Sequence, residues 1–586
     1  MKLNNPYATE NMKKALDTIK AKVARGEYFL PNNQPRQKSN SNILEQFNVS
    51  TSHEYIKFSP QSEDEMALLK QDSTLYLVDY PLDYEFDDAW HDNRPELAEG
   101  QFPEYFTSVA VGKSLPNVSN EKIAELYIPE DDIFFNGDTE TPVTKKTLIN
   151  NEEDLLHHLL YESYKLVGKE QELLEDNGEI IDPETQQKRW LFSRKWYPSG
   201  RLQVWDDIGG TTSGGFVCEE VITGYDYSAC TGTGFISLYD CVVPIYGTVC
   251  EPLDPLLGGG FVPLRGAQVL MRQIFTVRQG ITDANGDFST GSVRGKARYI
   301  IQWERYQYSI RNGSIFQAET RGPKVKSARW NKSIRGGDDE YHAMIHTAAH
   351  EYYYGDRFGT QSPRTVITGS QMKIAAIEVN DESGHVPFFS GITAQILPII
   401  YLKEWGEPSD QVYGTTIHEL AHAAHRNLDL NTYNKVVWDA YTNVALNFPL
   451  GNINSPMGPT AHNNRRLMET WATTIETLFT RRRYREQFGL ANYTYTFNNF
   501  QNLTTGELHY TSAGVDMLEG NYGLPINNQG IGNNVRPIDR VNGYTINQLE
   551  DALIDSSSWW EWRDRVFNID PANPTRNNLE ELFDNW

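Results

Sequence analysis

The spacing of hydrophobic and polar residues changes along the chain, and each spacing predicts a helix or a strand. Over residues 1–200 it predicts helices at 10–23, 63–70, 120–127 and 152–174 and strands at 55–58, 74–78 and 105–111. A polar stretch at 31–42, rich in Asn, Gln, Pro and Ser, reads as a linker. The β-α-β-β-α order between residues 55 and 127 predicts a plait-like α+β module.

After about residue 190 the pattern becomes that of short strands with glycine-rich connections. Residues 262–269 and 280–288 alternate as strands, and Asp283-Ala-Asn-Gly286 forms the turn after which Phe288 returns to the core. A β-sandwich is therefore expected in the middle of the chain.

The last part mixes helices with apolar strands. A helix is predicted at 338–354, a strand at 372–379, an apolar stretch at 396–402, and two long helices around His418 and after Asn463. A chain of 586 residues is too long for one core. We expect a multidomain α+β protein with a helix and linker at 1–45, an α+β module at 46–200, a β-sandwich at 201–315 and a C-terminal domain at 316–586.

The first of these long helices contains His418-Glu419-Leu-Ala-His422. Side chains four positions apart stack on one helix face, so His418 and His422 can each direct a ring nitrogen at one zinc ion. Glu419 lies one step round, where it can reach a water on the metal. The two histidines flank an apolar stripe made of Tyr413, Ile417, Leu420, Ala421, Ala424 and Leu428. The alternative is two surface histidines on an ordinary helix.

A zinc site of this kind needs a third protein ligand. The metzincin pattern is excluded, because His425 and Leu428 stand where that pattern has Gly and His. The second long helix carries Glu469 and Glu476 on the face opposite its apolar ridge, and either carboxylate can serve.

His346 and His350 are also four positions apart. No carboxylate lies between them, so a partly buried helix face is the alternative to a second metal site.

The combination of this pattern with Glu469-Thr-Trp-Ala472, a Glu-x-x-Ala sequence, resembles the gluzincins, the thermolysin-like and aminopeptidase-like zinc peptidases. The resemblance implies a zincin-like metallopeptidase domain and one Zn²⁺ ion held by His418, His422 and Glu469, with Glu476 as competitor. The spacing from His422 to Glu469 is longer than in many gluzincins. In zincins an edge strand beside the active-site helix binds the substrate backbone, and residues 388–402 are the candidate.

Two further resemblances concern the other domains. Val262-Pro-Leu-Arg-Gly-Ala-Gln-Val269, with the strand and turn that follow, resembles the carboxypeptidase-regulatory-like β-sandwich. The resemblance implies an Ig/transthyretin-like fold, and despite its name the module does not imply carboxypeptidase activity. Leu77-Val-Asp-Tyr-Pro-Leu-Asp-Tyr84 resembles amino-terminal modules of exported bacterial cell-surface proteins.

The expected chemistry follows from the ligands. Zinc lowers the pKa of bound water to about 7, and Glu419 acts as general base on that water and then gives the proton to the leaving amine. His509 and Tyr510 are candidate transition-state stabilisers by residue type and downstream position, and His462 is a further candidate.

Charge and cysteine use constrain partners and location. The formal net charge of −25 would repel nucleic acid and anionic membranes, and no apolar run is long enough to span a bilayer. All four cysteines (Cys218, Cys230, Cys241 and Cys250) are clustered, which predicts two disulfides in any of three pairings. A four-thiolate zinc site and reduced core cysteines are the alternatives.

The disulfides in turn predict export to a bacterial cell surface or the periplasm. The first residues lack the apolar core of a signal peptide, so the leader is expected to have been removed; a cytosolic protein is the alternative.

Two classes of function fit the sequence. One is a zinc peptidase acting on peptide or protein substrates, and the other is a non-catalytic surface-binding protein whose metal is structural or absent. The presence of Glu419 favours the peptidase, because a structural zinc site does not need it.

Overall fold

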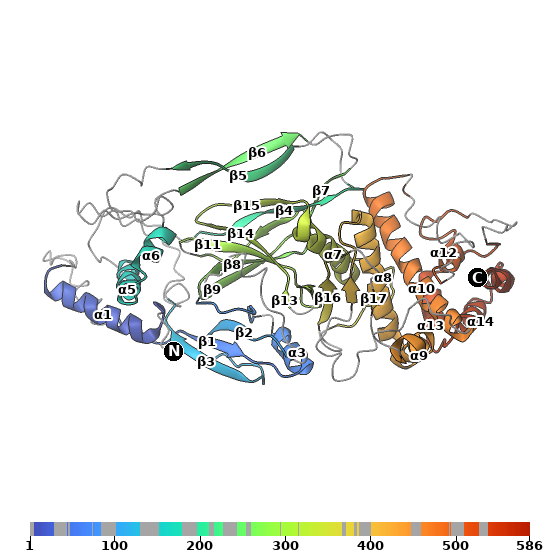
Figure 1. Ribbon diagram of the computed structural model, residues 1–586, viewed down its shortest axis with the longest axis horizontal. Helices are drawn as coiled ribbons and strands as arrows, with labels where there is room; N and C mark the ends of the chain where they lie inside the picture. Colours follow the sequence, from blue (N-terminus) through green and yellow to red (C-terminus); the bar gives the residue numbers. More distant parts are fainter. Residues whose placement is uncertain are drawn as a thin grey trace.

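The computed structural model shows an elongated α+β protein with its sheets in the middle and most of its helices toward the C-terminus (Figure 1). The described residues are 5–27, 44, 47–72, 74–83, 101–128, 152–177, 196–209, 216–226, 243–252, 259–293, 295–313, 316–365, 371–379, 384–385, 400–446, 459–491, 493, 509–526 and 537–586. Within them, 12 α-helices and several sheets confirm the mixed α+β prediction.

The first sheet is a small antiparallel one in the order β2-β1-β3 (β2 Tyr105–Ala110, β1 His53–Phe58, β3 Asn120–Leu126). The helix predicted at 120–127 is wrong, because this segment pairs along β1. Cross-strand ion pairs join Lys57 to Glu121 at 3.2 Å and Lys122 to Glu54 at 3.0 Å. The strand predicted at 74–78 is reduced to one bridge between Val78 and Phe106.

In Figure 1, helices lie to either side of this sheet. α3 (Glu63–Gln71) follows β1, and α1 (Thr9–Ala24) lies beside α5 (Glu152–Leu166), with α6 (Glu170–Asn177) next in the chain (Figure 1). The single helix predicted at 152–174 is thus two helices, because Gly168 adopts a positive φ of 74° between them. The linker at 31–42 lies outside the described residues.

Two four-stranded sheets form the centre of the molecule. One has the order β10-β4-β15, with β7 also paired to β4. The other has the order β14-β11-β8-β9. Their inward side chains, among them Leu202, Phe288 and Ile301, belong to one core, and Gly286 in the predicted turn has a φ of 77°. The strands are β4 Ser199–Asp206, β7 Gly260–Pro263, β8 Gln268–Gln273, β9 Thr276–Ile281, β10 Asp287–Ser289, β11 Ala297–Gln302, β14 Glu319–Val325 and β15 Trp330–Ile334.

A separate two-stranded ribbon holds two of the cysteines. β5 (Phe216–Asp226) pairs antiparallel with β6 (Val243–Pro252), and the register places Cys218 opposite Cys250. Cys230 and Cys241 lie outside the described residues.

The fifth sheet lies beside the C-terminal helices and has the order β13-β12-β16-β18-β17. β12 (Tyr308–Asn312), β16 (Met372–Ala376) and β18 (Ile400–Leu402) are parallel, whereas β13 (Phe316–Gln317) and β17 (Gly384–His385) are antiparallel to their neighbours. The expected division at 315/316 therefore does not separate two sheets, since β12 precedes it and pairs with β16.

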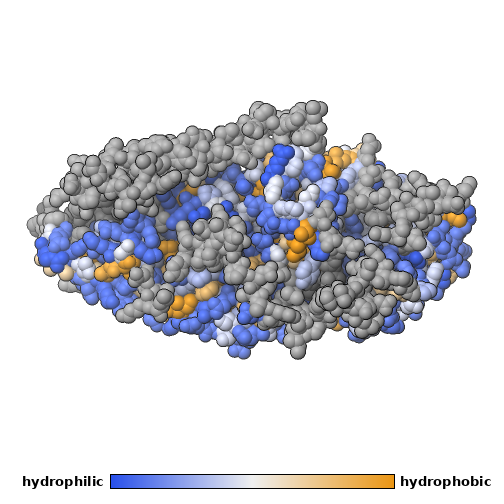
Figure 2. Space-filling model, viewed as in Figure 1, coloured by the Kyte–Doolittle hydropathy of each residue, from blue (hydrophilic) through white to orange (hydrophobic). Residues whose placement is uncertain are grey.

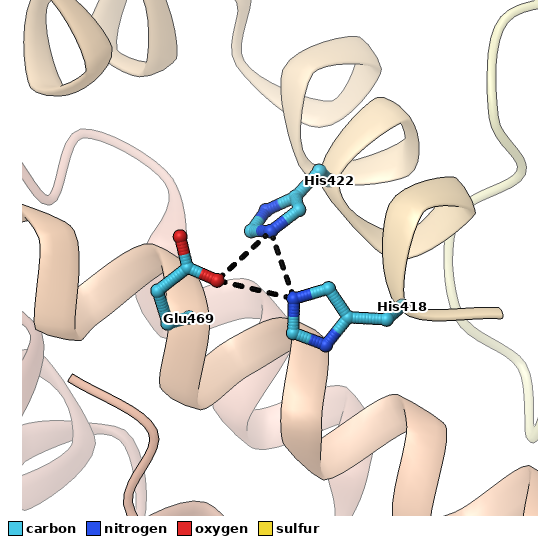
Figure 3. A group of neighbouring side chains, drawn as sticks. All are labelled: His418, His422 and Glu469. Carbon is cyan, nitrogen blue, oxygen red and sulfur yellow. Dashed lines mark hydrogen bonds and ion pairs between the residues drawn. The ribbon is translucent and has the colours of Figure 1, made fainter. Parts of the chain in front are cut away.

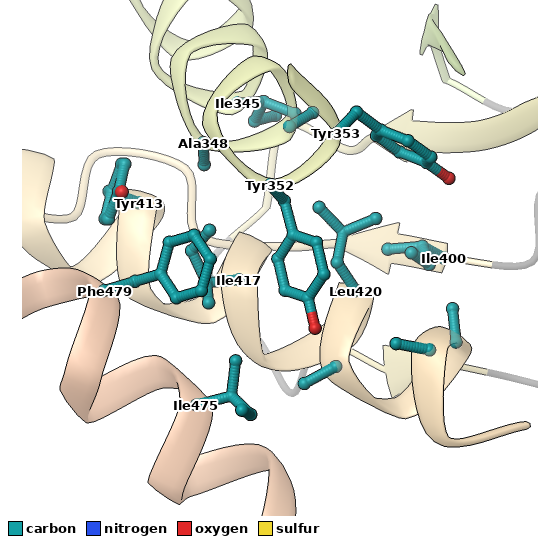
Figure 4. Close-up of a cluster of buried hydrophobic side chains, with 14 of the residues drawn as sticks. Ile345, Ala348, Tyr352, Tyr353, Ile400, Tyr413, Ile417, Leu420, Ile475 and Phe479 are labelled. Atoms are coloured by element: carbon teal, nitrogen blue, oxygen red, sulfur yellow. The ribbon is translucent and has the colours of Figure 1, made fainter. Parts of the chain in front are cut away.

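Two long helices, α7 (Gly337–Tyr354) and α8 (Ser409–Leu428), contact the strands of this sheet, and a third, α10 (Pro459–Thr480), packs against α8. Ile417 and Leu420 of α8 fill the space between α7 and α10, where the rings of Tyr352 and Phe479 stack at 5.1 Å (Figure 4). The remaining C-terminal elements are α9 Leu430–Leu446, a π-helix η6 Arg481–Gln487, α12 Ala513–Leu518, α13 Ile546–Leu553, α14 Trp559–Ile569, a 3-10 turn η7 Arg576–Asn578 and α15 Leu579–Asp584.

A buried ion pair ties the first strand of the central sheets to this helical region. Arg483 of η6 donates to the Asp206 carboxylate of β4 at 2.9 Å, and Asp206 is fully buried.

None of the helices in the described segments combines the length and the apolar character that a membrane span requires. On the face shown in Figure 2, hydrophilic residues cover most of the described surface and the apolar residues form small separate areas.

Candidate metal centre

The candidate metal site lies where α8 crosses α10. The apolar stripe of α8, including Ile417, Leu420 and Ala421, is buried in the core, and this fixes the rotation of the helix. As a consequence His418 and His422, one turn apart, face α10, and Glu469 faces them from that helix (Figure 3).

Three ligand atoms meet at this crossing. The Nε2 atoms of His418 and His422 are 3.1 Å apart. The Oε2 atom of Glu469 is 3.1 Å from the first nitrogen and 3.3 Å from the second. The three residues are buried, with 5–7% of their surface exposed. Figure 3 shows the three side chains pointing toward one another.

These separations fit a zinc ion. Ligand atoms about 2.0–2.1 Å from a tetrahedral zinc ion lie about 3.3–3.4 Å from each other. Two imidazoles and a carboxylate are also ligands that zinc accepts. The residues present can therefore hold the ion, and metal binding itself stays a prediction.

Glu476 has a different position from Glu469. Its Oε2 atom is 2.9 Å from Nδ1 of His418, on the side of the ring away from the three ligand atoms. A carboxylate in this position fixes the tautomer of a metal-binding histidine and leaves Nε2 for the ion. Of the two carboxylates that the sequence left as alternatives, the structure places Glu469 in the group of three.

The carboxylates also determine the charge of the site. Burial disfavours the charged form of His418, but its bonds to Glu469 and Glu476 outweigh burial and raise its pKa well above the usual range. Burial acts against the carboxylate of Glu469 too, yet His422 and His418 hold its pKa well below its usual range. Together with the buried Glu419, this is an electronegative site suited to a divalent cation.

Comparison with protein-family models, with curated proteins and with solved structures finds no match to this chain. The function must therefore be argued from the geometry of the site.

Tyr433 of α9 is a site residue that the sequence did not indicate. It is buried, and its ring lies 4.8 Å from that of His425. Burial raises the pKa of Tyr433 well above its usual range, and the charges of Glu469 and Glu419 raise it further. The charges of both carboxylates thus act on Tyr433, and Glu419 directly follows the ligand His418 in α8. No motif marks Tyr433; its contact depends on how α9 folds back on α8.

The predicted stabilisers lie near the same crossing. The ring of Tyr510 is 5.8 Å from that of His418. His509 is hydrogen-bonded to His462 at 3.0 Å, and burial together with Arg465 lowers its pKa to about 4, so it is uncharged at neutral pH.

His346 and His350 pack against other groups of the scaffold. His346 has contacts on both ring nitrogens, to the Tyr308 hydroxyl at 3.1 Å and to the Arg265 carbonyl at 3.0 Å. Among the described residues, His346 and His350 belong to no group that could hold a metal ion.

The edge strand predicted at 388–402 is wrong for residues 400–402, because β18 lies between β16 and β17. Residues 386–399 lie outside the described part of the chain. Of the strands that the structure describes in this sheet, β17 is the edge on the α8 side.

Proposed function

We propose that this protein is a gluzincin-like zinc peptidase in which His418, His422 and Glu469 hold the metal and Glu419 is the general base. The observation that carries the proposal is the convergence of three buried ligand atoms at 3.1–3.3 Å, together with the buried Glu419, which follows His418 in the chain and lies outside the set. A site that only bound zinc would not need that carboxylate.

Zinc in this site would act as a Lewis acid, polarising a peptide carbonyl and making water easier to deprotonate near neutral pH. Glu419 would take a proton from the attacking water while the water oxygen bonds to the carbonyl carbon. When the carbon–nitrogen bond breaks, Glu419 would return that proton to the amine nitrogen.

The chain's own donors would stabilise the negative charge that develops on the carbonyl oxygen. Tyr510 lies against His418, and the charge of Glu469 acts on Tyr433 and His509. Uncharged hydroxyl and imidazole groups can donate without repelling the metal. The edge strand β17, close to α8, would align an extended substrate backbone.

Replacing Glu419 with Gln tests the proposal, because Gln keeps the size of the side chain and removes the base. The zinc content should stay at one ion per chain, and hydrolysis of a susceptible peptide should fall about 10²–10⁴-fold. Glu404→Gln is the matched control: Glu404 is also a buried carboxylate, near the start of α8, outside the metal-binding group, and this variant should keep its activity. Equal turnover in the zinc-loaded wild type and Glu419→Gln would refute the proposal.

The deep burial of the three ligands favours a second candidate, a binding protein with a structural metal. In that case no member of a broad peptide library would be cleaved, and removal of zinc would lower the melting temperature without loss of any activity.

Export is proposed from the cysteines. The register that places Cys218 opposite Cys250 suits a disulfide, and disulfides persist in oxidising compartments. Thiol titration of the denatured, unreduced protein should find almost no free thiol, and four reactive thiols would refute export on this ground.

A further inference from the structure

His462 and His509 form a pair of histidines beside the metal centre. The geometry of this pair differs from that of His418 and His422. Nδ1 of His462, in α10, is 3.0 Å from Nε2 of His509, which lies just before α12. The two rings are almost coplanar, with 5° between their planes and 5.2 Å between their centres.

These values describe a straight hydrogen bond. A ring nitrogen lies about 1.1 Å from the centre of an imidazole, as its bond lengths require, so two nitrogens 3.0 Å apart that point directly at each other put the ring centres about 5.2 Å apart. The observed separation has that value. One proton therefore lies between these two nitrogens, and their lone pairs do not converge on a common ion.

The pair His418–His422 shows the contrast. Its nitrogens are 3.1 Å apart but its ring centres are only 4.8 Å apart, with 80° between the planes. The two nitrogens are therefore not directed along the line that joins them, as expected of ligands that share an ion with Glu469. The structure thus contains a metal-binding histidine pair and a proton-sharing pair.

The segment that carries His509 is attached to the helix of the third ligand. Thr470, directly after Glu469, donates from its hydroxyl to the His509 carbonyl at 3.4 Å and contacts the Thr511 hydroxyl at 2.9 Å. Between them, Tyr510 contacts His418. His462 comes two turns before Glu469 on the same helix, so both ends of the histidine pair are fixed relative to the metal centre.

We infer that His462 donates from its Nδ1 to Nε2 of His509 and in this way acts as a positioning residue. It fixes the tautomer and orientation of His509, which then offers a substrate its Nδ1 nitrogen. The inference rests on the proposed peptidase function. When His462 donates from Nδ1, the single proton of uncharged His509 is on its own Nδ1, and that N–H can donate to the substrate carbonyl oxygen as it becomes negative. No bond to hydrogen breaks in this step.

Two substitutions at position 462 separate positioning from packing. His462→Phe keeps a flat ring and removes the hydrogen bond, whereas His462→Asn keeps a short polar group that can replace Nδ1. We expect His462→Phe to lower kcat about 5- to 10-fold with KM unchanged, the effect of one lost hydrogen bond, and His462→Asn to recover most of the loss. Because His462 acts through His509, the double variant His462→Phe/His509→Phe should be no slower than His509→Phe alone.

A second measurement does not depend on activity. In protein labelled with ¹⁵N-histidine, the ring nitrogens of His509 should report one tautomer in the wild type and in His462→Asn, and a mixture of the two in His462→Phe.

Three results would overturn the inference while leaving the peptidase proposal intact: an unchanged kcat in His462→Phe, an unchanged tautomer of His509, or additive losses in the double variant. A second zinc ion that is lost in His462→Phe would show that the pair binds metal, which also overturns it. If the wild type cleaves no peptide, the proposed function and the role of His462 in it fail together.

Discussion

Substitution of Glu476 tests whether this carboxylate only orients the metal ligand His418, whereas Glu469 is itself a ligand. Glu476 accepts a hydrogen bond from Nδ1 of His418 at 2.9 Å, so Glu476→Gln can keep the bond but loses its charge. A hydrogen bond to a charged group contributes about 1.5–3 kcal/mol and one between neutral groups about 1 kcal/mol. The difference of about 1 kcal/mol predicts that Glu476→Gln weakens zinc binding about fivefold.

Glu476→Leu removes the bond as well. His418 then loses its orientation and its buried Nδ1 loses its acceptor, and loss of such an outer partner typically lowers metal affinity about 10–100-fold. Glu469→Gln removes one of the three ligands itself and should have the largest effect. The zinc affinity is expected to decrease in the order wild type, Glu476→Gln, Glu476→Leu and Glu469→Gln.

The assay is competition for zinc with a fluorescent chelator, with Glu404→Gln as the buried-carboxylate control. Thermal melting of each metal-free variant shows whether the fold is retained. The assignment is refuted if Glu469→Gln keeps full zinc affinity while Glu476→Gln loses it. Wild-type affinity in Glu476→Leu would show that the contact with His418 has no orienting role.

Three other predictions concern the scaffold. The register of β5 and β6 selects the pairing Cys218–Cys250 with Cys230–Cys241, which peptide mapping of the unreduced protein can check; a link from Cys218 to any other cysteine would contradict it. Burial raises the pKa of Glu550 from its ordinary value of 4.5 to about 7, so between these pH values the folded state holds a proton that the unfolded state has lost, and stability falls as pH rises. Glu550→Gln should remove that contribution, which is at most about 1.4 kcal/mol per pH unit. Calorimetry between pH 4.5 and 7 measures it as the slope of the free energy of unfolding against pH, and the same slope in wild type and variant would refute the prediction. Asp206→Asn leaves Arg483 buried without its charge partner and should lower the free energy of unfolding by about 3–5 kcal/mol in urea titrations, whereas a loss below about 1 kcal/mol would show that the pair is not needed.

Local spacing was enough to predict the helix of His418 and His422, because residues one turn apart share a face in any α-helix. Spacing could not decide between Glu469 and Glu476, since both lie on the same face of α10. Their difference comes from where α8 crosses α10: one carboxylate meets the two Nε2 atoms, and the other reaches the opposite nitrogen of His418.

The wrong predictions also have physical causes. Glu121, Lys122 and Glu125 favour a helix by composition, but pairing with β1 gives these charges partners and satisfies the backbone. Residues 400–402 are apolar enough for a strand, yet whether a strand is central or at the edge depends on the strand that arrives next to it, here β17. Tyr433 was missed because its contact with His425 is set by the turn between α8 and α9.

The pairing of β12 with β16 makes the C-terminal half dependent on chain that precedes it. A fragment starting at residue 316 would contain the metal ligands but lack Tyr308–Asn312, so β16, whose five residues are all buried in the full chain, would become an open sheet edge. Unpaired apolar edges recruit other strands, and such a fragment should aggregate. Useful truncations must therefore keep the central sheets together with the helices, and in the intact protein we expect these two parts to unfold as one cooperative unit.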